Sequence, residues 1–302
     1  MNIKKFLIKA YEEIYGIPLI VKCFWTKVMF PQETIVLKGF FIWKKWKIAN
    51  FNWGDDINLY FFKEVTGKRV VLLPDTKLAK CFSLENYLCI GSTIMSFDMR
   101  NTVVWGTGLL NDKMDFRLKS KPKKILAVRG PLTRRWLMEQ GVECPEVYGD
   151  PALLLPLFYH PTTSSCYRIG VIPHYKDLNN PVVKKISNQD GVKLIRISEY
   201  NDWHDFINQI NSCDSIVSSS LHGIIVSEAY KKPVVWAKFR GSEYVPGWDF
   251  KFHDYFESVK KENVLPIDID EATTIEELEE RAMKWSPGNI DIEKLKNSCP
   301  FW

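Results

Sequence analysis

Short apolar runs recur along the first half of the chain, separated by segments with the pattern of helices or loops. The runs cover residues 70–73, 87–90, 102–105, 125–128 and 146–148. Uninterrupted apolar runs of this length are typical of strands that are buried on both faces of a parallel sheet. The first half is therefore predicted to be an α/β domain built on such a sheet.

A second series of apolar runs begins after a polar segment rich in turn-forming residues, at positions 159–166. These later runs cover residues 168–172, 193–197, 215–217 and 233–237. The length of 302 residues suits two domains. We therefore predict an N-terminal domain at residues 1–160 and a C-terminal domain at residues 166–302, facing each other across a cleft.

Small and polar residues follow the predicted strands of the first half at the point where each strand ends. The clusters are Gly91-Ser92-Thr93, Gly106-Thr107-Gly108, Arg129-Gly130-Pro131 and Gly149-Asp150-Pro151. Because the carboxyl ends of parallel strands share one edge of a sheet, these clusters would converge on one ligand crevice. Arg129 can bind a carboxylate or phosphate there, and the alternative is a surface arginine paired with Asp150 or Glu139.

A further turn, at Asn52 and Gly54, precedes a predicted helix that has Asp55 and Asp56 in its first turn. Two interpretations stay open for this segment. The acidic residues can simply stabilise the helix dipole, or the loop can open toward a ligand at the helix N-terminus.

The most distinctive stretch lies between the predicted strand at 215–217 and a helix that begins near Ile224. It reads Ser218-Ser219-Ser220-Leu221-His222-Gly223. Such a turn directs backbone N–H groups toward a bound anion. Helix capping would explain one serine, but three serines, a histidine and a glycine within six residues favour a binding site. His222 and His174 both follow strands, where a histidine can bind an anion, carry a proton or only stabilise its own loop.

Composition narrows the class of protein. With 41 basic against 36 acidic residues the net charge is +5, which suits an anionic substrate or membrane surface, and no basic block indicates a nucleic acid partner. The 7 cysteines form no C-x-x-C pair, as expected for reduced thiols in a cytoplasmic protein. We expect no signal peptide, no membrane-spanning segment and no metal site, since none of their patterns is present.

The N-terminal region combines aromatic and basic residues. Residues 3–15 are predicted to form a short helix and residues 34–37 a strand. Between positions 22 and 47 the aromatic residues Phe24, Trp25, Phe30, Phe40, Phe41, Trp43 and Trp46 alternate with six lysines. This mixture indicates either a peripheral contact with the inner face of a membrane or a β-rich segment with solvated lysines.

Six motifs follow one another in a characteristic order. They are Asn52-x-Gly-Asp-Asp56, Gly91-Ser92, Trp105-Gly106-Thr107-Gly108, Val128-Arg129-Gly130-Pro131-x-Thr133, Gly149-Asp150-Pro151-Ala152 and Ser219-Ser220-Leu221-His222-Gly223. As a series, over roughly residues 50–240, they resemble the polysaccharide pyruvyl transferase family. The resemblance implies two Rossmann-like domains, arranged as in the two-domain glycosyltransferases.

The resemblance also implies a reaction. The donor would be phosphoenolpyruvate, and the acceptor a sugar of a surface or capsular polysaccharide, commonly galactose, mannose or glucose. The products would be a cyclic pyruvate ketal and phosphate, with no metal or other cofactor. If the N-terminal region contacts a membrane, the acceptor would be a polyprenyl-linked oligosaccharide on its cytosolic face.

Some residues match the positions at which the family binds its donor. They are Arg129 and His222, with Leu221 through its backbone, and Ser219, Ser220 and Gly223 complete the loop. Many members carry an arginine where this chain has Ser220. We therefore hypothesise that the missing positive charge comes from His174, Lys238 or Arg240.

Roles in catalysis are expected as follows. His222 is the first candidate for the general acid or for a clamp on the phosphate. Asp150 or Asp55 would serve the acceptor side as a base. Asn52, Ser92 and Thr107 would bind the acceptor.

Two alternatives remain at this point. The stretch from Glu228 to Val235 is similar to that of nucleotide-sugar glycosyltransferases, in which a glutamate holds the ribose. The absence of the arginine before Leu221 would also fit a relative that binds glycans without catalysis.

Overall fold

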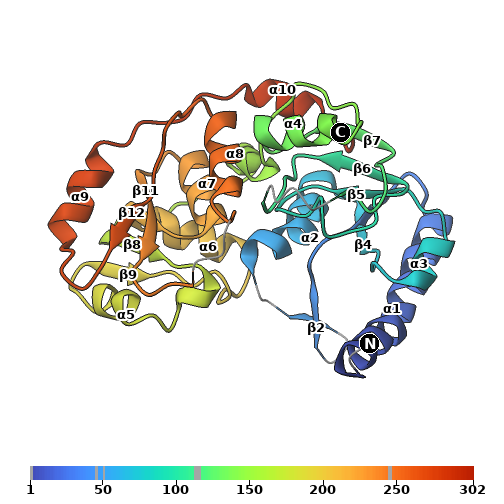
Figure 1. The fold of residues 1–302 in the computed structure, drawn as a ribbon, viewed down its shortest axis with the longest axis horizontal. Helices are drawn as coiled ribbons and strands as arrows, with labels where there is room; N and C mark the ends of the chain where they lie inside the picture. Colours follow the sequence, from blue (N-terminus) through green and yellow to red (C-terminus); the bar gives the residue numbers. More distant parts are fainter. Residues whose placement is uncertain (1–2, 45–46, 50–51, 112–116, 244–246) are drawn as a thin grey trace.

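The computed structural model describes residues 3–44, 47–49, 52–111, 117–243 and 247–302 (Figure 1). It contains two parallel five-stranded sheets with helices packed around them, and a separate two-stranded antiparallel hairpin. The predicted α/β fold class, with two Rossmann-like domains, is therefore confirmed.

The first sheet has the strand order β4-β1-β5-β6-β7. Its strands are β1 (Thr34–Leu37), β4 (Arg69–Leu72), β5 (Asn86–Leu88), β6 (Thr102–Trp105) and β7 (Lys124–Ala127). The helices of this half are α1 (Ile3–Met29), α2 (Trp53–Thr66), α3 (Lys77–Cys81), α4 (Pro131–Glu139) and the 3₁₀ helix η1 (Pro151–Leu157). The hairpin consists of β2 (Ile42–Lys44) paired with β3 (Lys47–Ala49).

The second sheet has the strand order β12-β11-β10-β8-β9. Its strands are β8 (Tyr167–Ile172), β9 (Val192–Leu194), β10 (Cys213–Ser218), β11 (Val234–Phe239) and β12 (Ile267–Ile269). The helices of this half are η2 (Tyr175–Asp177), α5 (Pro181–Ser187), α6 (Trp203–Asn211), α7 (Leu221–Ala229), α8 (Phe250–Ser258), α9 (Ile275–Met283) and α10 (Ile292–Asn297).

Two local predictions need correction. The helix expected at residues 3–15 extends to Met29, since apolar residues continue at helical spacing beyond position 15. The strand expected at 146–148 is reduced to a single bridge between Val128 and Tyr148. Of the basic-aromatic residues in the N-terminal region, Lys45 and Trp46 lie outside the described residues.

The strand orders place a topological switch point in each sheet. In the first sheet the chain leaves β1 for β4 on one side and then continues with β5 on the other. In the second sheet it leaves β8 for β9 and then continues with β10 on the opposite side. Ligands of open α/β sheets bind at the carboxyl ends of the strands at such points. The segments there are residues 38–41 and 89–92 in the first half, and 173–174 and 219–220 in the second.

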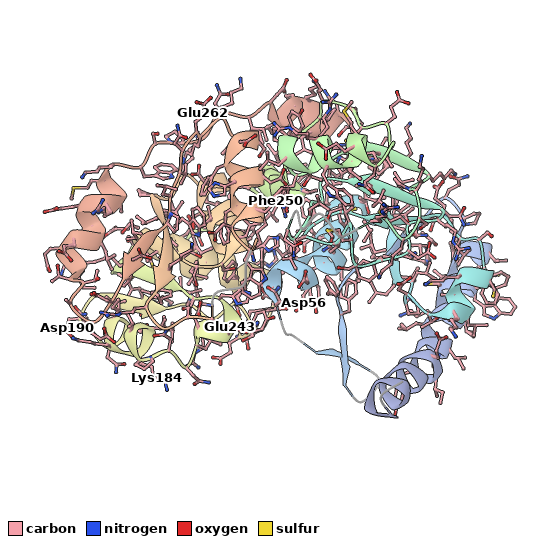
Figure 2. All side chains as sticks on the ribbon, in the orientation of Figure 1. Asp56, Lys184, Asp190, Glu243, Phe250 and Glu262 are labelled. Carbon is pink, nitrogen blue, oxygen red and sulfur yellow. The ribbon has the colours of Figure 1, made fainter. Side chains whose placement is uncertain are left out.

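The two halves share an apolar core where they meet. The Trp53 ring, at the start of α2, lies 4.7 Å from the Phe206 ring of α6, and its indole N–H donates to the Trp203 carbonyl at 2.8 Å. Figure 2 places Asp56 and Phe250 in this central region, with Lys184, Asp190 and Glu262 at the periphery. The N-terminus of α2 is thereby held against the second half.

The end of the chain returns to the first half. The indole N–H of Trp105 donates to the Ser298 hydroxyl at 2.9 Å, and the Phe301 ring lies 5.0 Å from that of Phe62. The domain limits at residues 160 and 166 stay a prediction. Across the described residues, no helix combines the length and the apolarity that crossing a bilayer requires.

Candidate active site

A cleft of about 410 Å³ lies between the carboxyl edges of the two sheets. Both halves contribute to its wall, which consists of Phe40, Phe41, Asn52, Asp55, Ser92, Leu110, His174, Tyr175, Ile197, Ser220, Leu221, His222, Trp248 and Lys251. Many of the residues singled out from the sequence are therefore brought together: Asn52, Asp55, Ser92, His174, Ser220, Leu221 and His222.

The N-termini of α2 and α7 border this cleft. Ser220 precedes α7, and its hydroxyl makes no capping hydrogen bond within the helix. Asn52 precedes α2 and accepts a hydrogen bond from the Gly54 N–H at 3.3 Å. Helix N-termini carry partial positive charge and free N–H groups. The cleft is therefore suited to an anion.

His222 is backed by a buried carboxylate. Its Nε2 atom lies 3.7 Å from Oδ2 of Asp150, and both atoms are buried without a hydrogen-bond partner among the described residues. The other oxygen of Asp150 accepts from the Ala152 N–H at 3.0 Å. Asp150 is fully buried, so it can orient His222 but does not contact the cleft. A role of Asp150 on the acceptor side stays a prediction.

A glycine lets α2 approach this histidine. A Cβ atom at position 54 would lie 2.0 Å from Nδ1 of His222. No side chain fits at that distance, so only glycine allows the start of α2 and the start of α7 to lie in contact. Gly54 of the Asn52-x-Gly54 motif is therefore needed for the packing of α2 against His222.

Asp55 is the carboxylate that reaches the cleft. Burial raises its pKa to about 6, although His222, a hydrogen bond from Asn52 and the Lys251 charge act in the opposite direction. The Asn52 amide donates to Asp55 at 2.7 Å, which fixes the carboxylate. A group with this pKa can exchange protons near neutral pH.

Lys251 was not identified from the sequence. It lies in the first turn of α8 and lines the cleft, and its ammonium lies 5.4 Å from the centre of the Trp248 ring and 5.2 Å from that of Phe252. Burial, aided by the Arg129 charge, lowers its pKa to about 8, whereas Asp55 acts to raise it. A lysine flanked by Phe250 and Phe252 gives no pattern that would mark it as a ligand-binding residue.

Arg129 has a different place from the one expected. Its side chain is fully buried, and its guanidinium pairs with Asp254 of α8 at 3.0 Å. It also donates to the Ser92 hydroxyl at 2.6 Å and to the Leu109 carbonyl at 2.5 Å. Ser92 lines the cleft, so Arg129 contributes to the cleft by holding the Ser92 hydroxyl. Direct donor binding by Arg129 stays a prediction. Neither partner considered from the sequence, Asp150 or Glu139, is its partner.

The motif around Arg129 holds the two halves together. The Asp254 carboxylate also accepts from the backbone N–H and the hydroxyl of Thr133, at 2.8 and 2.7 Å, and so caps α4. A Cβ atom at Gly130 would lie 1.8 Å from the Asp254 carbonyl oxygen. The close approach of α8 to α4, which carries Lys251 to the cleft, therefore depends on this motif.

Three other expected site residues lie away from the cleft. Thr107 is fully buried and bonds to Thr93 and to the Gly91 carbonyl, and its contact with the acceptor stays a prediction. Arg240 has a side chain 73% exposed beside Asp270 and does not line the cleft. Gly223 is buried in α7, where a Cβ atom would lie 2.3 Å from the Ser218 hydroxyl.

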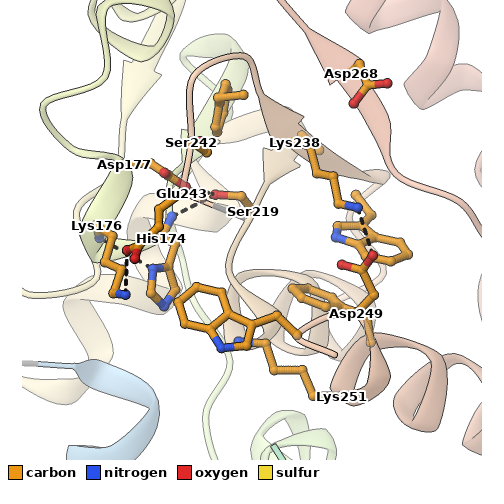
Figure 3. A pocket seen from close by; sticks show the side chains of 15 residues that line it. His174, Lys176, Asp177, Ser219, Lys238, Ser242, Glu243, Asp249, Lys251 and Asp268 are labelled. Carbon is orange, nitrogen blue, oxygen red and sulfur yellow. Dashed lines mark hydrogen bonds and ion pairs between the residues drawn. The ribbon is translucent and has the colours of Figure 1, made fainter. Parts of the chain in front are cut away.

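A second cavity of about 250 Å³ adjoins the cleft, and we call it the aromatic cavity (Figure 3). It lies at the carboxyl ends of β10 and β11 and shares His174, Trp248 and Lys251 with the cleft. The rest of its lining is Lys176, Asp177, Ser219, Trp236, Ala237, Lys238, Phe239, Ser242, Glu243, Asp249, Phe252 and Asp268.

The remaining donor candidates lie in this aromatic cavity. Lys238 pairs with Asp249 at 2.8 Å, on the side opposite His174 (Figure 3). The Ser219 hydroxyl donates to the Asp177 carboxylate at 3.1 Å and accepts from the backbone N–H of His174 at 2.8 Å. Burial and the charges of Lys251 and Lys176 lower the pKa of His174 to about 3. This low pKa favours the neutral imidazole of His174.

Comparison with known proteins identifies the family. A sequence profile of the polysaccharide pyruvyl transferases matches residues 88–237. The chain belongs to the polysaccharide pyruvyl transferase family. It is 30% identical to "Uncharacterized protein L143" of Acanthamoeba polyphaga mimivirus over 211 residues, 69% of this chain and 71% of that protein. It is 27% identical to "Succinoglycan biosynthesis protein ExoV" of Rhizobium meliloti (strain 1021) over 218 residues, 71% of this chain and 63% of that protein.

Family membership indicates a transferase that pyruvylates polysaccharides. The matched region holds Ser92, Arg129, Asp150 and His222, but ends before Lys251 and begins after Asp55. Asp55 and Lys251, two cleft residues with shifted pKa values, therefore come from outside the region that the family profile matches.

Glu228, the residue that suggested a glycosyltransferase, forms hydrogen bonds and an ion pair within the chain itself. The two oxygens of Glu228 accept hydrogen bonds from the Trp285 indole at 2.8 Å and the Gly288 N–H at 3.1 Å, and Glu228 also pairs with Lys261. Glu228 lines neither the cleft nor the aromatic cavity. It joins α7 to the C-terminal segment, so it offers no acceptor for a ribose in this arrangement.

Proposed function

We propose that this chain transfers the pyruvyl group of phosphoenolpyruvate onto two hydroxyls of one sugar, giving a cyclic ketal and phosphate. The observation that carries the proposal is the convergence of the α7 N-terminus, Lys251, Asp55 and His222 in one cleft, with Asp150 buried behind His222. The N–H groups at the start of α7 and the Lys251 ammonium suit the phosphoryl group of the donor, which leaves as inorganic phosphate.

The donor is placed with its phosphate at the N-terminus of α7, near Ser220 and Lys251. Lys251 then replaces the arginine that many relatives carry before the Leu-His-Gly motif. The N–H groups at the start of α7 and the ammonium stabilise the charge that grows on the phosphate as its bond to carbon breaks. The N-terminus of α2 lies on the opposite wall and presents Asp55 to the cleft.

The chemistry divides between His222 and Asp55. His222 protonates the methylene carbon of the enol, which becomes the methyl group and leaves positive charge on the central carbon. One sugar hydroxyl adds to that carbon while Asp55 accepts its proton, and the carbon–oxygen bond to phosphate breaks. The second hydroxyl then adds at the same carbon. Of the two protons that the hydroxyls release, one makes up for the proton that His222 gave to the methyl group, and the other leaves with phosphate.

The acceptor sugar is placed in the aromatic cavity. Its charged groups are mixed, with Lys238 paired to Asp249 and with Asp177 and Asp268 nearby, which does not favour an anion. Carboxylates and ammonium groups beside the indole of Trp248 suit the hydroxyls and apolar face of a neutral sugar ring. Galactose is the sugar to test first, and the relative named for succinoglycan biosynthesis supports an exopolysaccharide as its carrier.

Calorimetric titration of the full chain tests the donor assignment without requiring an acceptor. We expect phosphoenolpyruvate to bind, inorganic phosphate to compete with it, and a sugar nucleotide to bind much more weakly. Saturating binding of the sugar nucleotide, with none of phosphoenolpyruvate, would instead support a glycosyltransferase.

A further inference from the structure

An apolar face of α1 points into solvent. Ile14, Ile17, Val21, Trp25 and Val28 follow one another at spacings of three or four residues, and each is between 44% and 64% exposed. Residues at this spacing form one continuous stripe along a helix. We call this stripe the outer face of α1. Contiguous exposed apolar surface of this kind marks an interaction site.

The opposite face of α1 is fixed to the protein. Ile20 and Cys23 are buried and pack with Val36 of β1 and Val71 of β4. The Cys23 thiol donates to the Leu72 carbonyl at 2.8 Å. The helix therefore does not need to leave the domain to present its outer face, and Figure 1 shows it at the rim of the first half, remote from the second sheet.

The chemistry of this helix favours a lipid surface. From Ile14 to Met29 the only charged residues are Lys22 and Lys27, and no acidic residue interrupts the stripe. Lys27 is engaged with the carbonyls of Pro31 and Thr34, whereas Lys22 is exposed at the margin of the outer face. An indole and aliphatic side chains bordered by a lysine match the interface of an anionic bilayer.

We propose that the outer face of α1 docks this protein on an anionic phospholipid surface, with the helix lying parallel to it. A second copy of the chain docked on this face would instead bring two Lys22 side chains together, on two chains that each carry a net charge of +5. Phospholipid offers acyl chains to Val21 and Trp25 and phosphate groups to Lys22, so both parts of the surface find a partner.

Sedimentation of the full chain with vesicles tests this docking. Phosphatidylcholine vesicles with and without about 30% phosphatidylglycerol separate the apolar from the electrostatic contribution. Val21→Glu combined with Trp25→Glu is expected to weaken binding by about tenfold or more, and Lys22→Gln by a few-fold at low salt only. Leu265→Glu, at a residue 74% exposed elsewhere on the surface, is the matched control and should bind as the parent does.

The outcomes are distinguishable. The substituted side chains are exposed, so thermal unfolding should be unchanged, and turnover of a soluble galactoside should be unchanged as well. Absence of vesicle binding by the parent chain, or equal binding by the double variant, would overturn the proposal. Dimerisation abolished by the double variant, without vesicle binding, would overturn it in favour of a second copy.

Discussion

Nε2 of His222 lies 3.7 Å from Oδ2 of Asp150, and both atoms are buried without another partner among the described residues. This distance is slightly longer than a hydrogen bond. A proton on Nε2 of His222 would let the two groups close into a charge-assisted hydrogen bond that fixes the orientation of the imidazole. The arrangement therefore suits a histidine whose protonated state takes part in the reaction.

Replacing either member of this pair should slow the reaction. His222→Ala is expected to lower kcat by about a hundredfold or more, since it removes the proton donor. Asp150→Asn should lower kcat by about tenfold or more, because a hydrogen bond to a charged group contributes about 1.5–3 kcal/mol. Steady-state kinetics with circular dichroism as the folding control checks both, and His222→Ala with full turnover would remove His222 from the mechanism.

The pH dependence should be bell-shaped. Asp55 must be ionised to accept a proton, so kcat/KM should fall as the pH drops below about 6. Lys251 must be protonated to hold the phosphate, so kcat/KM should fall as the pH rises above about 8. Lys251→Arg should move the alkaline limb upward, because arginine stays charged. An alkaline limb that stays in place in this variant would show that Lys251 is not the group that titrates.

Lys251 should determine donor affinity. Lys251→Ala is expected to raise the Kd for phosphoenolpyruvate by about 10- to 100-fold, the equivalent of a lost hydrogen bond between charged groups. Arg240→Ala is the matched control, since its exposed side chain lies beside Asp270 and lines no part of the cleft. Calorimetry distinguishes the two, and a larger effect of Arg240→Ala would reverse the assignment.

Arg129 should act mainly on stability. Arg129→Ala leaves the Asp254 carboxylate buried without its cation, and is expected to cost about 3–5 kcal/mol of unfolding free energy. Denaturant unfolding measures this directly, with Asp254→Ala as the reciprocal variant. Normal stability combined with a raised Kd for phosphoenolpyruvate would instead assign Arg129 to the donor.

Trp248 should separate acceptor from donor binding. Trp248→Ala is expected to raise the KM for a galactoside by about tenfold, within the range for loss of one aromatic contact, and to leave the donor Kd within about twofold. Trp248→Phe retains an aromatic ring and should be less affected. Equal losses for donor and acceptor would place Trp248 in the donor site instead.

The sequence allowed the sheets and part of the site to be predicted, for identifiable reasons. Apolar runs mark buried strands, and polar residues that follow them, such as Ser92, Ser220 and His222, lie along the carboxyl edges where a cleft forms. Which segment from the other half crosses that cleft is decided by tertiary packing. The place of Lys251 in the cleft could not be predicted because it depends on the Arg129–Asp254 pair, and no sequence pattern shows that the Thr107 hydroxyl turns inward to Thr93.

Phosphate should leave phosphoenolpyruvate only when a sugar diol accepts the pyruvyl group. Phosphate release should be measured with and without a panel of β-galactosides and lipid-linked galactose. We predict release that depends on the acceptor, with a ketal methyl signal appearing in the product. No release with any acceptor, although glycan or sugar nucleotide binds, would contradict the account and indicate a glycan-binding relative or a glycosyltransferase.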